Sequence, residues 1–296
     1  MSKVLNRIYG TLVADRWTLG FIDEPLSDIV NDGRYNIHYV SGIPRDRWYA
    51  DPFILDYNDK TIELLVEEFQ YKRWRGRIAH ITIDKKTYKL VSEKIILDID
   101  THLSFPFIVR EGNTIYVFPE NSMSNSWNKY EYDRKNDRLL KIKSIINEPL
   151  TDAVVVKAFG NPLVFSTRQP DANGNVLYVF TKEGVITKEI SFASKVARGA
   201  GDWFSIDGML YRPAQDCNGV YGKAVIIQKV EVNSEGLYTF TDVRRIESTN
   251  PNHKRGCHTF NSYKDLTVVD VNGYRWGVIG TLTDMVKELF KLICKH

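Results

Sequence analysis

Residues 50–68 read ADPFILDYNDKTIELLVEE, and four later segments repeat the same pattern. Each segment has a small or polar opening, a short apolar stretch, a turn rich in Gly, Asn or Asp, and a second apolar stretch. The copies begin near residues 104, 151, 200 and 257 and read SFPFIVREGNTIYVFPE, TDAVVVKAFGNPLVFST, AGDWFSIDGMLYRPAQD and CHTFNSYKDLTVVDVNG. A period of roughly 50 residues is that of a propeller blade with four strands. We therefore predict an all-β chain that forms a five-bladed β-propeller over residues 1–280.

The segments between these copies supply further strand candidates. Short runs of β-branched and aromatic residues occupy residues 77–83, 176–181, 224–232 and 237–242. Helical periodicity is nearly absent until residues 281–296, where apolar side chains fall largely on one face. This pattern predicts a C-terminal amphipathic helix flanked by Lys287, Lys291 and Lys295. The helix either packs on the propeller or a partner protein, or lies on a membrane surface.

The composition narrows the class of protein. The chain has 296 residues, 43% of them hydrophobic, and a net charge of +3, with no block of like charges that would indicate nucleic-acid binding. The three cysteines form no CxxC pair, which disfavours a disulfide framework or a zinc site. No signal-peptide pattern and no run of about 18 apolar residues is present. We expect a cytoplasmic protein, with a peripheral membrane position as the alternative.

Polar residues open the repeats, and these positions are the candidate site. The innermost strand of each blade lines the central channel of a propeller, so the starts of these strands converge although they are distant in sequence. The residues at these positions are Asp51, Ser104, Asp152, Asp202 and His258, with His102 nearby. Aspartate is a poor strand former, and its recurrence in three repeats suggests function. The alternative is that these aspartates accept backbone hydrogen bonds in turns.

Cationic, amide and aromatic residues accompany these positions. The candidates for substrate binding in or beside the repeats are Arg168, Arg198, Trp203, Arg212, Gln215 and Tyr221. Several arginines facing the channel would make the site electropositive and suit a phosphate or carboxylate on the ligand. The alternative for the arginines is a salt bridge to a neighbouring aspartate, and the alternative for each aromatic residue is the core.

The stretch WYADPFI, residues 48–54, resembles the first-blade motif of five-bladed propeller glycosidases of the arabinanase and β-xylosidase type. That resemblance implies that Asp51 is a general base and that Asp152 tunes the acid. The fourth-blade stretch ARGAGDWF departs from the pattern, because it lacks the glutamate that serves these enzymes as general acid. The acid would have to be Glu120, Glu68 or Asp202, and Glu120, at the end of its repeat, is the best placed.

A second resemblance covers most of the chain. The segments that carry it are HLSFPFI (102–108), PEN (119–121), ARGAGDWF (197–204), YRPAQDC (211–217), YGKAVII (221–227) and CHTFN (257–261). They are similar to the propeller domain named for plant glucosamine inositolphosphorylceramide transferases. In the plant proteins this propeller precedes a separate glycosyltransferase domain, for which this chain has no room. The resemblance implies a sugar or nucleotide-sugar ligand.

Three functions follow from these observations. The first is glycosyl transfer in the synthesis of a cell-surface glycan, with Asp51 or Asp152 removing the acceptor proton and Glu120 as a further catalytic candidate. The second is a non-catalytic glycan-binding scaffold, and the third is glycoside hydrolysis. No catalytic metal is predicted, although a Ca²⁺ or Na⁺ ion in the channel, or a metal held by Asp51, His102 and His258, is left open.

Overall fold

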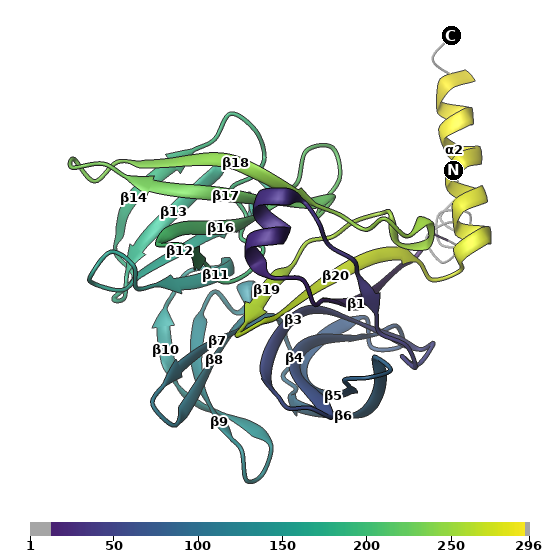
Figure 1. Ribbon diagram of the computed structural model, residues 1–296, viewed down its shortest axis with the longest axis horizontal. Coiled ribbons are helices and arrows are strands. Elements are labelled where there is room, and N and C mark those ends of the chain that lie inside the picture. The colour runs from purple at the N-terminus through teal and green to yellow at the C-terminus, as the bar shows by residue number, and fades with distance from the viewer. Residues whose placement is uncertain (1–12, 294–296) are drawn as a thin grey trace.

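The computed structural model describes residues 13–293, in which five four-stranded antiparallel sheets surround a central channel (Figure 1). The prediction of a five-bladed β-propeller with a C-terminal helix is confirmed. The recurring segments form the two inner strands of each sheet.

Four blades are built from consecutive strands. Blade 1 consists of β3 (Arg47–Tyr57), β4 (Thr61–Gln70), β5 (Arg75–Asp84) and β6 (Lys89–Leu97). Blade 2 consists of β7 (Ser104–Glu111), β8 (Thr114–Glu120), β9 (Trp127–Asp133) and β10 (Arg138–Ile146). Blade 3 consists of β11 (Leu150–Val156), β12 (Leu163–Arg168), β13 (Val176–Thr181) and β14 (Ile186–Ser191). Blade 4 consists of β15 (Phe204–Ile206), β16 (Met209–Asp216), β17 (Ala224–Val232) and β18 (Tyr238–Ile246).

Blade 5 combines both ends of the chain. Its strands are β19 (Phe260–Tyr263), β20 (Leu266–Tyr274), β1 (Asp15–Ile22) and β2 (His38–Tyr39). β1 pairs with β20 from Asp15 opposite Tyr274 to Ile22 opposite Thr267. This pairing closes the ring of sheets, and the sequence pattern did not predict it. Within residues 13–293, three short helices lie in the loops, at η1 (Asp28–Asp32), η2 (Ser122–Ser124) and η3 (Pro251–His253).

Apolar side chains fill the space between neighbouring blades. The inner strands are buried on both faces, which explains why their sequences are nearly continuous apolar runs. The outermost strands β6, β10, β14 and β18 alternate or expose most of their side chains. The strands expected at residues 176–181 and 224–232 have the bounds observed for β13 and β17.

The first three inner strands share one irregularity near their starts. The pairing register slips between Ala50 and Phe53 in β3, and equivalent slips occur in β7 and β11. The bulged residues Asp51, Phe105 and Asp152 have φ angles of 50°, 41° and 48°. A left-handed conformation costs a non-glycine residue about 1–3 kcal/mol and persists where the surrounding structure enforces it. Blade 4 has Gly201 at the corresponding place, with a φ of 151°.

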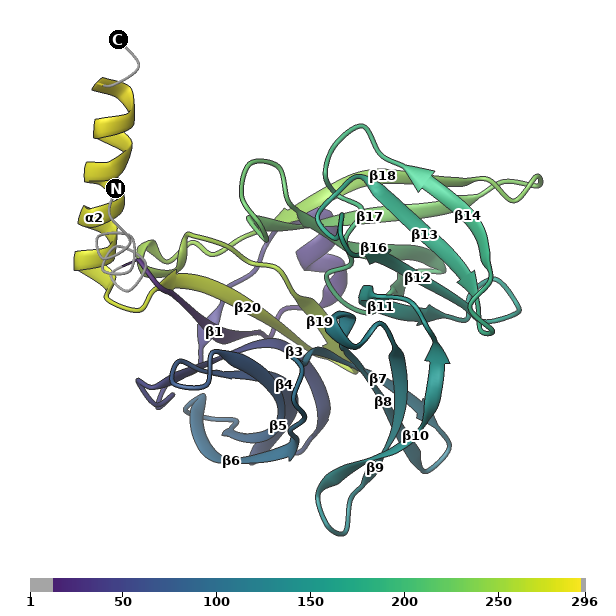
Figure 2. The same ribbon diagram turned by 180° about the vertical axis from the view of Figure 1, so that it is seen from behind.

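The C-terminal helix α2 (Gly277–Ile293) begins four residues before the predicted start at residue 281. Figure 2 shows that it stands away from the propeller beside the end of β20. The predicted flank of Lys287, Lys291 and Lys295 lies outside the described side chains. Within residues 13–293, no helix is long and apolar enough to cross a membrane. The cytoplasmic location expected from the sequence stays a prediction.

Candidate functional site

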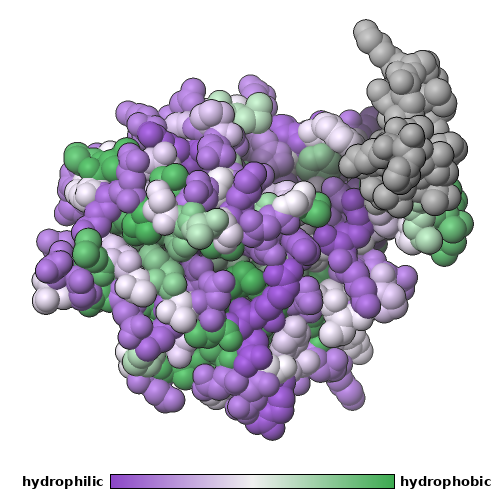
Figure 3. Space-filling model, turned by 90° about the horizontal axis from the view of Figure 1, so that it is seen from above, coloured by the Kyte–Doolittle hydropathy of each residue, from purple (hydrophilic) through white to green (hydrophobic). Residues whose placement is uncertain are grey.

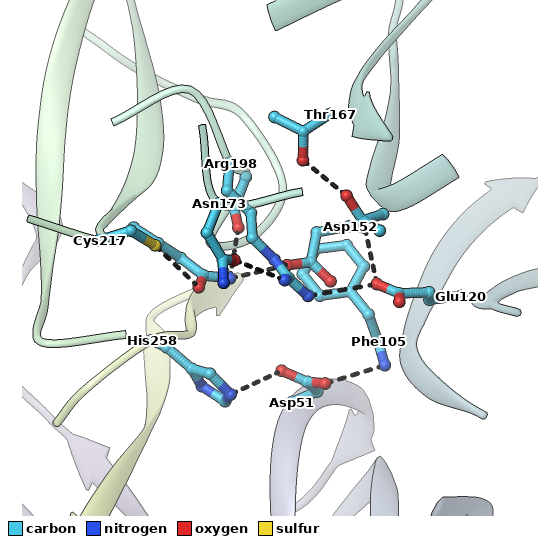
Figure 4. A network of polar contacts seen from close by, with 12 residues as sticks. Asp51, Phe105, Glu120, Asp152, Thr167, Asn173, Arg198, Cys217 and His258 are labelled. Carbon is cyan, nitrogen blue, oxygen red and sulfur yellow. Dashed lines mark hydrogen bonds and ion pairs between the residues drawn. The ribbon is translucent and has the colours of Figure 1, made fainter. Parts of the chain in front are cut away.

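Carboxylates gather where the inner strands begin, at the end of the channel that we call the head (Figure 4). The group comprises Asp51, Glu67, Glu120, Asp152 and Asp270, from blades 1, 2, 3 and 5, and each is no more than 7% exposed. Buried carboxylates require hydrogen-bonded or charged partners. The partners of this group define the site.

Backbone N–H groups of the bulged residues supply the first set of partners. Asp51 N donates to Asp270 Oδ2 at 2.9 Å, and Phe105 N donates to Asp51 Oδ2 at 3.0 Å. Asp152 N donates to Glu120 Oε2 at 3.0 Å. Each bulge therefore binds a carboxylate of the preceding blade. The left-handed backbone of blades 1 to 3 thus connects neighbouring blades around the head of the channel.

Asp51 also has two side-chain neighbours from blade 5. Thr259 Oγ1 donates to Asp51 Oδ1 at 2.8 Å, and His258 Nε2 lies 3.7 Å from the same oxygen. The other ring nitrogen of His258, Nδ1, lies 2.7 Å from Asp270 Oδ2. Asp51, His258 and Asp270 therefore form a chain in which the imidazole lies between two carboxylates. The indole of Trp17 stacks on the imidazole at 3.9 Å and fixes its plane.

Asp152 and Glu120 are joined by Arg198. Arg198 Nε donates to Asp152 Oδ2 at 2.5 Å, Nη2 lies 3.4 Å from Glu120 Oε2, and Nη1 donates to Asn173 Oδ1 at 2.8 Å. Gln215 Nε2 donates to Asp152 Oδ2 at 2.7 Å. The Arg198 guanidinium is therefore held by three residues, as Figure 4 shows.

Burial shifts the acidities of this cluster. Desolvation raises the pKa of Asp51 to about 7, and the charge of His258 opposes that rise. Desolvation, followed by the charge of Asp152, raises the pKa of Glu120 to about 8. The pKa of His258 is raised to about 9, because the attraction of Asp270 and Asp51 for the imidazolium outweighs desolvation. At neutral pH Asp51 is thus near its titration point, Glu120 is mostly protonated and His258 is charged.

Glu67 and His102 extend the site toward solvent. His102 Nδ1 accepts from Gly76 N at 3.0 Å, and its Nε2 lies 3.2 Å from Glu67 Oε1. The charge of Glu67 raises the pKa of His102 against an opposing desolvation effect. Tyr221, 41% exposed, borders the site from blade 4, with its ring edge-on to His258 and 5.0 Å from the Arg198 guanidinium.

A metal ion remains an open prediction, and the structure identifies the atoms that could hold one. Asp51, His258 and Asp270 each offer a ligand atom, all within 4.8 Å of one another. His102 does not join this group, because its imidazole pairs with Glu67. In the arrangement described, His258 and Asp270 already satisfy each other.

Ser104 lies where sequence reasoning placed it, but Glu68 does not. Ser104 is buried and stands opposite Glu120 in the pairing of β7 with β8. The Glu68 side chain forms a buried ion pair with Arg77, 2.9 Å from Nη2, because successive side chains of a strand point to opposite faces. Its neighbour Glu67 points to the site instead, so Glu68 is not the missing acid.

Arg212 and Arg168 correct the prediction of an electropositive site. Arg212 is 1% exposed and donates to Ala197 O and Gln228 Oε1. Its guanidinium faces the rings of Phe192, which follows β14 of blade 3, and Phe240, in β18 of blade 4. Burial lowers its pKa to about 9. Arg168 pairs with Glu148 at 3.3 Å in a shallow pocket that none of the head residues lines. The head of the channel therefore presents five carboxyl groups against the cationic side chains of Arg198, His102 and His258, so it is not electropositive.

Asp202 and Trp203 lie in a different place from the one predicted. They line a cavity of about 400 Å³ whose walls include Arg110 and Lys157, from the far ends of β7 and β11. We call this end of the channel the foot. Asp202 is open to the cavity, yet the enclosing protein raises its pKa to about 7, against the charges of Arg110 and Lys157. Trp203 packs on Phe165 with ring centroids 4.6 Å apart.

Sequence reasoning missed Glu67, Thr259 and Asp270. Glu67 follows the apolar run Leu64–Val66 of β4, and Asp270 lies between valines in β20, and these acidic residues within apolar stretches were the available signal. Thr259 lies beside His258 and gave no separate signal.

Five sheets around a channel with buried carboxylates at its head define a five-bladed propeller of the fold found in GH43 enzymes. A GH43 β-xylosidase/α-arabinofuranosidase from a compost microbial metagenome superposes with a TM-score of 0.51 at 9% identity, covering 76% of this chain and 84% of that one. A GH43_1 enzyme from Xanthomonas citri, complexed with xylotriose, gives 0.51 at 8% identity, covering 79% and 88%. At these identities the likeness shows the fold alone.

Residues 39–280 match the family described as glucosamine inositolphosphorylceramide transferase 1, N-terminal, and the chain belongs to that family. The relative of that name from Arabidopsis thaliana is 30% identical over 217 residues, which cover 69% of this chain and 28% of the relative. The relative from Oryza sativa subsp. japonica is 30% identical over 196 residues, which cover 62% of this chain and 26% of the relative. The chain thus spans about a quarter of the length of these relatives.

Proposed function

We propose that this propeller binds a glycan acceptor at the head of its channel and acts in glycosyl transfer, as part of glycan synthesis. The observation that carries the proposal is the set of neighbours around the buried Asp51 carboxylate, namely Phe105 N, Thr259 Oγ1 and His258 Nε2. Burial raises the pKa of Asp51 to about 7, which suits a general base at neutral pH. The names of the relatives describe transferases, which supports the reaction class.

In the proposed reaction Asp51 removes the proton of an acceptor hydroxyl. The hydroxyl oxygen forms a bond to the anomeric carbon of an activated sugar, and the bond from that carbon to the leaving group breaks with its electron pair. The proton remains on the Asp51 carboxyl. The charge of His258 and the hydrogen bond from Thr259 favour the ionised form of Asp51 before the reaction.

We place the acceptor, and not the phosphates of a donor, at the head. A nucleoside diphosphate requires charge neutralisation as it leaves. The guanidinium of Arg198 is already engaged by Asp152, Glu120 and Asn173. Both histidines of the head are likewise paired with carboxylates, His258 with Asp270 and His102 with Glu67. Carboxylates instead accept hydrogen bonds from sugar hydroxyls. The phosphates of a nucleotide-sugar donor would then have to be bound by residues outside the head.

A second candidate is a glycan-binding scaffold without turnover. It is favoured by the completeness of the Arg198 contacts, which leave Asp152 and Glu120 satisfied without a ligand. It is also consistent with a propeller that accounts for about a quarter of its relatives.

The test is a transfer assay with UDP-N-acetylglucosamine, UDP-glucose and GDP-mannose as donors and inositol phosphate or oligosaccharides as acceptors. We expect Asp51→Asn to lower turnover roughly 10²–10⁴-fold, the usual contribution of a general base. The matched control is Asp202→Asn, at the foot, which should leave turnover within about twofold. Equal turnover of wild type and Asp51→Asn would refute the base. Acceptor binding without turnover would support the scaffold, and release of free sugar into water would support hydrolysis.

A further inference from the structure

The outer face of helix α2 exposes an apolar stripe. Its members, with their exposed fractions, are Val278 (76%), Ile279 (53%), Leu282 (56%), Met285 (63%) and Val286 (52%). Because successive helical residues are about 100° apart, these five fall within an arc of about 120°. A stripe of this width normally lies against a core or another apolar phase. We call it the α2 stripe.

The contact of α2 with the propeller shows which way the stripe faces. Gly280 is buried against Tyr274, and a Cβ at this glycine would lie 2.5 Å from Tyr274 Cγ. On the helical wheel Gly280 is about 160° from the centre of the stripe. The helix therefore contacts blade 5 through its small residue, and the stripe points away from the propeller. Figure 3 shows hydrophobic surface at this projecting edge of the molecule.

Arginines surround the base of the helix. Arg16, Arg45 and Arg275, together with Trp276, border a hollow of about 540 Å³ that continues onto the first turn of α2. Arg16 donates to the carbonyl oxygens of Ile43 and Pro44, and Arg275 lies 3.8 Å from the centre of the Tyr71 ring. Among the described residues, no carboxylate lies within ion-pair distance of these three guanidinium groups. Within the part of the chain that the structure describes, they form a cationic cluster without an ion-pair partner.

We infer that the α2 stripe and this arginine cluster together dock the protein on an anionic bilayer surface. An interfacial helix buries its apolar face at the headgroup boundary while cationic side chains bind anionic lipids, and tryptophan favours the same depth. Trp276, 43% exposed, lines the same hollow as the three arginines and the first turn of α2. The combination of apolar surface with unpaired positive charge favours a membrane over a protein surface.

The position of the dock bears on the proposed function. The α2 stripe and the arginine cluster lie on the head side of blade 5. Arg16 is next to Trp17, which stacks on His258, and α2 follows the end of β20. A docked protein would hold the head of the channel close to the bilayer. The docking itself does not depend on the proposed function. Only its consequence does, namely that the acceptor glycan is attached to a lipid.

The experiment is vesicle flotation of the full chain with phosphatidylcholine vesicles, with and without phosphatidylserine. We expect binding that requires the anionic lipid and weakens at high salt. Arg45→Gln with Arg275→Gln should lower the partition coefficient roughly 25-fold, at about fivefold for each arginine near the surface. Leu282→Ser with Met285→Ser should lower it on the same vesicles. Circular dichroism of each variant verifies the fold.

The matched controls are Arg138→Gln and Ile142→Ser, exposed residues on the outer strand β10 of blade 2, which should bind as wild type. Absence of wild-type binding to anionic vesicles, or equal loss in the controls, would overturn the inference. So would a dimer in sedimentation equilibrium that the stripe variants dissociate, because the stripe would then be a protein interface. No sugar is present, so failure here is distinct from failure of the transfer assay.

Discussion

The head and the foot of the channel each contain an aspartate with a pKa of about 7, but only one belongs to a connected site. At the head, Asp51 has a histidine, a threonine and a backbone N–H as neighbours, and three further carboxylates raise its pKa after burial does. At the foot, Asp202 accepts a hydrogen bond from its own neighbour, Trp203 N, and lies in a cavity with two cations. A shifted pKa therefore does not identify the active end, and the network of neighbours does.

Asp202 lies one position later in its repeat than Asp51 and Asp152 do in theirs. Asp51 and Asp152 each follow the small or hydroxyl residue that opens the repeat, Ala50 or Thr151. In blade 4 that place belongs to Gly201, and Asp202 comes one position later. Because successive side chains point to opposite faces, one position is enough to direct a side chain elsewhere. Gly201 leaves no room for a side chain, since its Cβ would lie 2.1 Å from Phe260 O.

The largest predicted difference in stability between the head and the foot is that caused by replacing Arg198. Replacing Arg198 by Met leaves the Asp152 carboxylate buried without its cation, which should lower the free energy of unfolding by about 3–5 kcal/mol. Arg110→Met at the foot removes an arginine that donates to two backbone carbonyls and should cost less. Urea denaturation of both variants measures the difference. Equal losses would show that the head is no more interdependent than the foot.

Trp203 and Tyr221 separate packing from ligand binding. Trp203→Ala removes a half-buried ring that packs on Phe165 and should cost about 3 kcal/mol of stability, the low end for such a change, with sugar affinity unchanged. Tyr221→Ala, at the mouth of the head, should cost little stability and weaken sugar binding. Thermal denaturation and saturation-transfer NMR on each variant give the two readouts. The reverse pattern would place the ligand at the foot.

The pH dependence of stability should differ between wild type and Glu120→Gln. The pKa of Glu120 is about 8 in the folded protein against an ordinary 4.5, so between these values the folded state holds a proton that the unfolded state has released. The stability contributed by the protonated Glu120 carboxyl is therefore complete below about pH 4.5. It falls as the pH rises toward 8, by at most about 1.4 kcal/mol per pH unit. Glu120→Gln should lack this fall. Urea midpoints at several pH values would show parallel curves if Glu120 is ionised at neutral pH.

The repeats predicted the five blades, because each blade buries two strands whose apolar runs are visible in the sequence. The closure of blade 5 was not predictable in the same way, since β1 pairs with a strand about 250 residues later and has no repeat of its own. Asp51, Asp152 and His258 lie near one another, as the convergence of inner-strand starts predicts, but Asp202 does not join them. Arg198 forms a salt bridge to Asp152, which was the alternative for the arginines. The position of Arg212 was not predictable, because a lone arginine in a strand gives no sign of which face it occupies.

The most direct test of the account is a ¹³C NMR titration of the aspartate and glutamate carboxyls, with and without inositol phosphate and oligosaccharides, using Asp51→Asn and Asp202→Asn for assignment. We predict that both aspartates titrate near pH 7 and that ligand shifts the Asp51 resonance while leaving that of Asp202 in place. A ligand that shifts the Asp202 resonance and leaves that of Asp51 unchanged would contradict this prediction, because the ligand would then bind at the foot of the channel.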